Sequence, residues 1–176
     1  MERWQRIRLI AMDVDGVLTD GQIIYGNNGQ ELKAFNVQDG MGITLAHRAG
    51  LYTAIVTGRT SEAVSRRAEE LRITVCRQGV TSKREGLESV LQQLGVSPEE
   101  TVFIGDDLND LPAMALVDLP VAVANAVVEV KQAAIFCTQA PGGRGAVREV
   151  IERILKEQGL WENLVKEVAA GARTRQ

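Results

Sequence analysis

The stretch that decides the fold is Ile7-Arg8-Leu9-Ile10-Ala11-Met12-Asp13-Val14-Asp15-Gly16-Val17-Leu18. Residues 7–12 have the length and the apolar, partly branched side chains of a buried parallel strand. Two carboxylates, Asp13 and Asp15, follow that strand directly. Like charges repel and burial disfavours ionisation, so such a pair needs a cation, and oxygen ligands suit Mg²⁺. We therefore predict a metal-dependent acid pair at the carboxyl end of the first strand, where open α/β sheets have their active sites.

The composition is typical of one globular domain over residues 1–176. Hydrophobic residues make up 45% and charged residues 24%, close to globular averages. The net charge of −3 gives no indication of a nucleic-acid partner. No apolar run is long enough to span a membrane, and residues 1–6 lack the apolar centre of a signal peptide. We expect a soluble, cytoplasmic protein without a membrane partner, in which Cys76 and Cys137 are reduced core residues.

Strand-like segments alternate with helix-like segments along the chain. The apolar strand candidates are residues 7–12, 52–56, 73–76, 101–104, 121–124 and 135–138. Amphipathic segments lie between them, as at 41–49, 63–71 and 82–94. This alternation predicts an α/β, three-layer Rossmann-like fold, in which helices cover both faces of a central parallel sheet. A C-terminal tail of about 159–176 completes the chain, and residues 169–176 are expected to fray.

One segment breaks the alternation. Residues 22–25 and 31–35 have the pattern of two short strands, and Gly26-Asn27-Asn28-Gly29 between them supplies the positive φ of a tight turn. The sequence predicts a β-hairpin over about 21–36, directly after the acid pair. A surface hairpin without a role is the plainer interpretation. Its place in the chain favours a flap over the site, acting as a lid or as an assembly surface.

A second acidic cluster follows another predicted strand. Residues 101–104 lead into Gly105-Asp106-Asp107-Leu108-Asn109-Asp110. Acidic and amide side chains at the end of a buried strand are again costly without a cation. A helix start with solvated acids would explain one of these aspartates but not the whole group.

Two further strand ends carry groups that suit an anion. Residues 52–56 lead into Thr57-Gly58-Arg59, which offers a hydroxyl, an accessible backbone N–H and a guanidinium. Lys83 lies in the first turn of a predicted helix, where the helix dipole disfavours a cation unless an anion is bound. Lys83 taken alone would be interpreted as a surface residue. Together with the carboxylates, these groups predict phosphoryl transfer through a carboxylate nucleophile, with a second carboxylate as general acid and base.

The four acidic and anion-binding segments also have a known arrangement. Asp13-Val14-Asp15-Gly16, Thr57-Gly58, Lys83 and Gly105 to Asp110 match the motifs of the haloacid dehalogenase (HAD) superfamily in order and spacing. The chain resembles its phosphotransferases. That resemblance implies that Asp13 is the nucleophile and Asp15 the general acid and base. The presence of Asp15 favours a phosphatase over a dehalogenase, which needs no acid for a halide leaving group.

The resemblance implies roles for the remaining motif residues. Thr57 and Lys83 would hold the phosphoryl group. Asp13, the backbone carbonyl of Asp15 and Asp106 would bind Mg²⁺. Asp110 would support that site from behind, and Asp107 is a further candidate for the same role. No large insertion lies between the motifs, so the HAD fold is expected without a cap domain.

A narrower resemblance covers residues from about 8 to 165. Residues 18–21, 35–40, 56–59 and 142–149 are similar to the 3-deoxy-D-manno-octulosonate 8-phosphate (KDO 8-phosphate) phosphatase family. It implies hydrolysis of that sugar acid phosphate in lipopolysaccharide precursor synthesis, and a capless homotetramer whose hairpins assemble together. A neighbouring subunit would roof the active site. The loop at 142–145 and the residues after it would belong to a tail that closes over the site.

Substrate specificity is expected to depend on arginines near the phosphate site. Arg59 directly follows the Thr-Gly pair, and relatives acting on nine-carbon substrates tend to carry an acid there, so Arg59 favours the eight-carbon substrate. Arg67 is a second candidate, although a solvated helix face also explains it. Gln38 stands where the family more often has arginine. His47 lies away from the motifs and is expected to be a structural or surface residue without a role in catalysis.

Three alternatives remain open from the sequence. A phosphatase for a related substrate, such as a 9-phosphononulosonate, would use the same motifs. A signalling receiver domain also has an acidic Mg²⁺ pocket, but it places its phosphorylated aspartate on a middle strand rather than the first. A non-catalytic HAD-like assembly domain would be expected to lose motif residues, and this chain keeps them.

Overall fold

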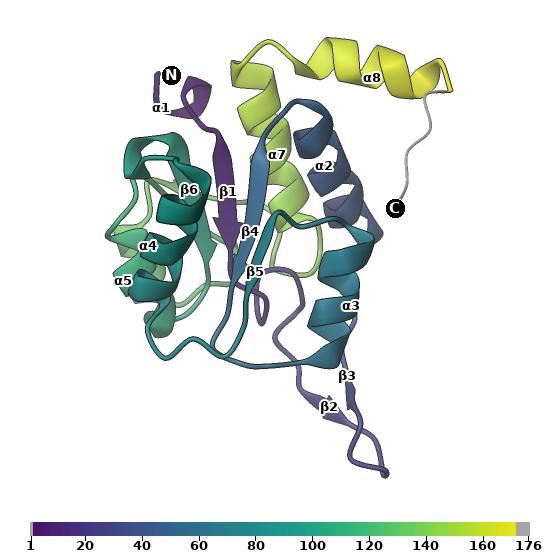
Figure 1. The fold of residues 1–176 in the computed structure, drawn as a ribbon, viewed down its shortest axis with the longest axis vertical. Coiled ribbons are helices and arrows are strands. Elements are labelled where there is room, and N and C mark those ends of the chain that lie inside the picture. The colour runs from purple at the N-terminus through teal and green to yellow at the C-terminus, as the bar shows by residue number, and fades with distance from the viewer. Residues whose placement is uncertain (1, 172–176) are drawn as a thin grey trace.

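A six-stranded parallel sheet forms the centre of the computed structural model, which describes residues 2–171 (Figure 1). The strands, in spatial order, are β5 (Val75–Arg77), β4 (Tyr52–Val56), β1 (Leu9–Met12), β6 (Thr101–Gly105), β7 (Leu119–Ala122) and β8 (Phe136–Cys137). β1 pairs with β4 and β6, and Leu9 aligns with Tyr52 on one side and Thr101 on the other. The carboxyl ends of these three strands therefore meet at one edge of the sheet, as the sequence predicted.

Helices cover both faces of the sheet and make the three expected layers. The helical elements are α1 (Glu2–Gln5), α2 (Val37–Arg48), α3 (Glu62–Glu70), α4 (Lys83–Leu94), η1 (Pro98–Glu100), η2 (Leu108–Asp110), α5 (Leu111–Met114), α6 (Val128–Ala133), α7 (Ala146–Glu157) and α8 (Trp161–Ala169). α2, α3 and α7 lie on one side, and α4 and α5 lie on the other (Figure 1). All of β1 and β6 is buried because both faces are covered.

Several strand boundaries differ from the prediction by one or two residues. β7 begins at Leu119, two residues before the predicted segment, and ends at Ala122. Pro120 lies inside this strand, although proline lacks the N–H that a central strand donates. The carbonyl of Pro120 still accepts from the Ile135 N–H at 2.9 Å, and the residue pairs with Phe103. β5 likewise begins at Val75 rather than at Ile73.

The predicted hairpin is present but short. β2 (Ile24–Tyr25) and β3 (Glu31–Leu32) pair antiparallel, and the hairpin extends away from the sheet (Figure 1). Its apolar side chains are exposed in the single chain, including Tyr25 at 65% and Leu32 at 48%. It contacts the loops at the strand ends through Lys33, which contacts Asp15, and through Glu31 and Tyr25, which contact Arg59. An exposed apolar ribbon of this kind is typical of an assembly surface.

The prediction for the cysteines as core residues is wrong for Cys137, which is exposed, and Cys76 is half-buried. Cys137 lies on β8, an edge strand that no further strand covers within residues 2–171. Both thiols are free, as predicted. Within the same range, every helix is too short or too polar to cross a membrane.

The C-terminal segment does not lie over the strand ends of its own chain. α7 packs along α2 as a core helix, and residues such as Val150 and Ile154 are fully buried. α8 lies beside α7 at the opposite end of the molecule from the hairpin (Figure 1). Of the tail predicted to fray, residues 172–176 lie outside the described residues, and α8 extends to Ala169.

Candidate active site

The loop after β1 holds its two carboxylates in a tight turn. Asp13 is buried at the end of the strand, with 4% of its surface exposed, and Asp15 lies two residues further on. Gly16 has φ +92° and its α-carbon faces the Asp106 carboxylate, which occupies the space that a Cβ would need. Only glycine fits that position. The hydroxyl of Thr19 closes the turn by accepting from the N–H groups of Gly16 (3.4 Å) and Gly21 (3.3 Å).

The loop after β6 is built around Asp110. This carboxylate is fully buried, and its Oδ2 accepts from the backbone N–H groups of Asp106 (2.9 Å) and Asp107 (3.2 Å). Gly105 has no room for a Cβ because the Asp110 side chain packs against it. The side chain of Asp107 is turned to cap η2, with Oδ1 accepting from the Leu108 N–H at 2.7 Å. Asp110 therefore shapes the loop that presents Asp106.

Lys83 joins the two loops from the start of α4. Its Nζ lies 2.6 Å from Asp13 Oδ2 and 2.6 Å from Asp110 Oδ1, and only 4% of its side chain is exposed. The Ser82 hydroxyl begins the helix by accepting from the Glu85 N–H at 3.3 Å. The unfavourable position of a cation in the first helical turn is thus explained by two carboxylates in front of it. Their proximity raises the pKa of Lys83, although burial opposes this.

The carboxylates present unpartnered oxygens to one point. Ligand atoms of Asp13, Asp106 and Asp110 lie within 4.8 Å of one another. Asp13 Oδ1 and Asp106 Oδ1 are buried and accept no hydrogen bond within residues 2–171, whereas both oxygens of Asp110 are occupied. Two orphaned carboxylate oxygens are what a hard cation such as Mg²⁺ satisfies. The arrangement fits a metal bound by Asp13 and Asp106, with Asp110 behind them.

Electrostatics support the same conclusion. Burial raises the pKa of Asp13, the neighbouring Asp110 charge raises it further, and Lys83 opposes both. Burial, followed by the charges of Asp110 and Asp13, raises the pKa of Asp106 to about 7. Without a cation this site therefore holds an excess of negative charge, which a divalent ion would neutralise.

We expect Mg²⁺ to stabilise the protein more at pH 8 than at pH 5. Without metal, folded Asp106 keeps a proton between pH 3.8 and about 7 that the unfolded chain has released, so stability falls as pH rises through this window. Mg²⁺ displaces that proton, and its stabilising effect therefore grows over the same range. The measurement is the thermal midpoint in EDTA and in Mg²⁺ at several pH values. A Mg²⁺ shift that is the same at pH 5 and pH 8 would contradict it, and Asp106→Asn should reduce the pH dependence, with the remainder due to Asp13.

A small cavity opens above the carboxylates, at the carboxyl ends of β1, β4 and β6. Its volume is about 220 Å³. The residues lining it are Asp13, Asp15, Gly21, Thr57, Gly58, Arg59, Asp106, Asp107 and Asn109. Thr57 is buried, and its backbone is held by hydrogen bonds to Arg77 and Val80. The structure thus gathers residues from three separate segments around one cavity, with Lys83 and Asp110 buried among them.

Three other residues named from the sequence lie elsewhere. The guanidinium of Arg67 packs against Gly40 of α2 and pairs with Glu70 at 3.3 Å, so the structure does not bring it to the cavity. Gln38 is exposed in the first turn of α2, on the side of Gly145. His47 Nε2 lies 2.7 Å from the Thr53 hydroxyl, which confirms a structural position.

The glycine-rich loop at 142–145 braces the site from behind and does not cover it. The Gly143 N–H donates to the Val17 carbonyl at 2.9 Å, and Gly142 packs so closely on the Gly16 carbonyl that a Cβ has no room. The buried carboxylate of Asp39 accepts from the backbone N–H groups of Arg148 (2.8 Å) and Gly145 (3.3 Å), where α7 begins. Within this chain the loop does not line the cavity, and closure of the tail over a site in the assembly stays a prediction.

Sequence reasoning missed two residues beside Asp15. Lys33 and Glu31, from the second arm of the hairpin, are within ion-pair distance of each other, and Lys33 also contacts the Asp15 carboxylate. Their spacing of two residues, which puts both on one face of a strand, was the only signal in the sequence. Asn109 belongs to the second acidic cluster but was assigned no role, and its Oδ1 lies 3.4 Å from Lys83 Nζ.

Comparison with known proteins agrees with this geometry. A family model described as haloacid dehalogenase-like hydrolase matches residues 75–151. The 3-deoxy-D-manno-octulosonate 8-phosphate phosphatase KdsC of Escherichia coli K12 is 47% identical over 155 residues, which are 88% of this chain and 82% of that protein. The crystal structure of the Yersinia pestis phosphatase has a TM-score of 0.90 at 46% identity, over 92% of this chain and 87% of the other. The Moraxella catarrhalis phosphatase, in complex with magnesium, phosphate and KDO, has a TM-score of 0.92 at 41% identity, over 95% and 96%.

Proposed function

This chain belongs to the 3-deoxy-D-manno-octulosonate 8-phosphate phosphatase family of haloacid dehalogenase-like hydrolases, and from that premise we propose how its residues act. It is a phosphoric monoester hydrolase that converts KDO 8-phosphate to the free sugar acid and phosphate, in lipopolysaccharide precursor synthesis, and it uses Mg²⁺. The observation that carries the mechanism is the buried Asp13 carboxylate, paired with Lys83 through one oxygen and unpartnered at the other within residues 2–171.

Asp13 is the nucleophile in this proposal. Its carboxylate attacks phosphorus, the ester oxygen leaves, and an aspartyl-phosphate forms that water then hydrolyses. Asp15 donates a proton to the leaving oxygen and later takes one from the water. Mg²⁺, held by Asp13, Asp106 and the Asp15 backbone carbonyl, supplies charge neutralisation at the phosphoryl oxygens.

The remaining residues hold substrate and ligands in place. Thr57, the backbone at Gly58 and Lys83 bind the phosphoryl oxygens, and Arg59 contacts the sugar acid beyond them. Asp110 keeps Lys83 and the Asp106 loop in position, with Asp107 fixing the start of η2. We leave Arg67 out of this set because it packs on α2.

We propose that residues 1–176 form one phosphatase domain and that four copies assemble through their hairpins. The support is the exposure of the apolar side chains of Ile23, Ile24, Tyr25 and Leu32 in the single chain. A neighbouring subunit would then roof the cavity. We also propose a cytoplasmic location, which two free cysteines support.

The test is phosphate release with and without Mg²⁺ from a panel of esters. The panel holds KDO 8-phosphate, a 9-phosphononulosonate and ordinary hexose phosphates. We expect Mg²⁺-dependent turnover with a preference for the eight-carbon substrate. Preference for the nine-carbon compound would keep the mechanism and change the substrate. Absence of turnover of every ester would favour the assembly-domain alternative.

A further inference from the structure

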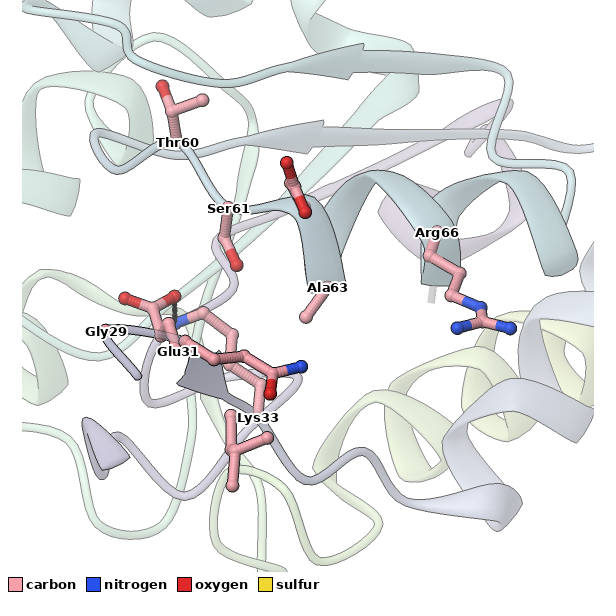
Figure 2. Close-up of a pocket in the computed structure, with 10 residues that line it drawn as sticks. Gly29, Glu31, Lys33, Thr60, Ser61, Ala63 and Arg66 are labelled. Atoms are coloured by element: carbon pink, nitrogen blue, oxygen red, sulfur yellow. Dashed lines mark ion pairs between the residues drawn. The ribbon is translucent and has the colours of Figure 1, made fainter. Parts of the chain in front are cut away.

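Lys33 is a buried cation in an otherwise exposed hairpin. Only 1% of its side chain is accessible, whereas its neighbour Leu32 is 48% exposed. A lysine is seldom buried unless its charge is paired. Figure 2 shows Lys33 beside Glu31 at the wall of a cavity of about 520 Å³ between the hairpin and the start of α3. The cation is therefore directed inward from the hairpin, toward the catalytic loop.

The partners of Lys33 form a closed ring of alternating charge. Its Nζ donates to Asp15 Oδ1 and lies 3.4 Å from Glu31 Oε1. Arg59 completes the ring, with its guanidinium 2.5 Å from Glu31 Oε2 and its Nε 3.6 Å from Asp15 Oδ2. Two cations thus alternate with two carboxylates. The ring ties the hairpin, through Lys33 and Glu31, to the loops that carry Asp15 and Arg59.

The two oxygens of Asp15 are held unequally. Oδ1 accepts a charge-assisted hydrogen bond from Lys33, which restricts rotation of the carboxylate. Oδ2 faces Arg59 at 3.6 Å, which is beyond hydrogen-bond distance. The Asp15 side chain therefore has one oxygen, Oδ1, that is anchored, and one oxygen, Oδ2, that is free to exchange a proton with a reacting group.

We propose that Lys33 is a positioning residue for Asp15: it anchors Oδ1, so that the proton passes to the leaving ester oxygen from Oδ2. This rests on the proposed role of Asp15 as general acid. It also assigns the hairpin a part in catalysis besides assembly, because correct placement of the hairpin is what delivers Lys33. Glu31 pairs with Lys33 and Arg59 but does not contact Asp15, so it affects Asp15 only through these two cations.

The test compares two leaving groups in Lys33→Met. An alkyl phosphate needs a proton on its leaving oxygen, whereas 4-nitrophenyl phosphate releases a stable phenolate without one. We expect first-turnover release of the alcohol to fall by about 10-fold or more, since a positioned acid contributes about 10²–10⁴-fold in rate. First-turnover release of nitrophenol should fall by less than about 3-fold, because that step bypasses the acid. Rapid-quench measurement isolates this step from the later hydrolysis of the aspartyl-phosphate.

Controls separate positioning from a merely structural role. Arg66→Met removes a cation that lines the same cavity but is 84% exposed and faces Glu70, and it should leave both rates unchanged. Lys33→Arg should restore part of the alkyl rate. In an Asp15→Asn background, Lys33→Met should have no further effect on the alkyl ester. Sedimentation of each variant reports whether the assembly is intact.

The outcomes distinguish this inference from the proposed function. Equal losses on both esters would show that Lys33 only docks the hairpin, and would overturn the inference. If Asp15→Asn strongly slows the alkyl ester but Lys33→Met slows both esters equally, the role of Asp15 as general acid stands. The inference about Lys33 is then overturned. Poor use of KDO 8-phosphate by the unaltered chain would overturn the substrate alone, because generic esters suffice for this comparison. If Lys33→Met does not fold, Glu31→Gln should produce the same leaving-group difference at smaller size, and its absence there would also count against the inference.

Discussion

Asp13→Asn is expected to lower phosphate release by about 10⁴-fold or more, because it removes the carboxylate that forms the covalent intermediate. Asparagine has the same shape, so the turn after β1 can persist. The variant loses the ion pair between Asp13 and Lys83, but Lys83 keeps Asp110 at 2.6 Å. It also removes two unfavourable contributions that raise the pKa of Asp13, namely the cost of burying the charged carboxylate and its repulsion by Asp110. These effects oppose one another, so the free energy of unfolding in EDTA should change little.

The measurement combines turnover, thermal unfolding and mass spectrometry of acid-quenched protein. The unaltered chain should carry phosphate on Asp13 during turnover, and the variant should not. Stabilisation by Mg²⁺ should also decrease, since Asp13 is one of its proposed ligands. Asp118→Asn is a matched control, because Asp118 pairs with Arg3 and Arg6 near the N-terminus, away from the cavity. Turnover within about 10-fold of the unaltered chain would disprove the nucleophile assignment.

Deleting the chain after Pro141 is expected to prevent folding. The deletion removes α7, in which Val147, Val150, Ile151, Ile154 and Leu155 have no exposed surface. Burying one such side chain contributes about 1.5–3 kcal/mol, so these five exceed about 7 kcal/mol, compared with about 5–15 kcal/mol for the stability of a whole domain. The sequence alone suggested that this deletion would remove only a substrate-closing tail. The packing of α7 on α2 overturns that expectation.

Deletion after Gly159 provides the matched comparison. It removes α8, whose one buried apolar residue is Leu164, together with the Trp161 ring that lies against Arg148 and Lys156. We expect a folded protein that is less stable by about 2–4 kcal/mol. Circular dichroism and denaturant titration of both truncations measure the difference. A cooperatively folded product of the longer deletion would contradict the assignment of α7 to the core.

Much of the site could be predicted because its chemistry follows the ends of strands. The buried strand before Asp13 and the one before Asp106 are visible as apolar runs, and parallel strands bring their carboxyl ends to one edge. Asp13, Thr57 and Asp106 therefore had to converge once the strands were identified. Lys83 could also be placed from nearby residues, because the capping pattern at Ser82 predicts the start of a helix directly before it.

Other positions could not be predicted, because they depend on how the elements pack. Arg67 was a candidate for substrate, but the rotation of α3 directs it toward Gly40 of α2. The loop with the glycines at 142 and 143 was assigned by resemblance to a closing tail, and in the structure their missing side chains allow close approach to the catalytic loop. Cys137 is exposed because β8 ends the sheet, which an apolar run does not reveal.

The amino-acid sequence by itself determined the strand–helix alternation, the acidic turns and the type of chemistry, because each depends on residues close together in the chain. The tertiary structure alone decided that α7 belongs to the core, that Asp39 caps its start, and that Lys33 reaches Asp15 from the hairpin. These contacts join segments whose separation along the chain carries no signal. They form because burying the apolar faces of the helices and pairing buried charges fixes where each segment must lie.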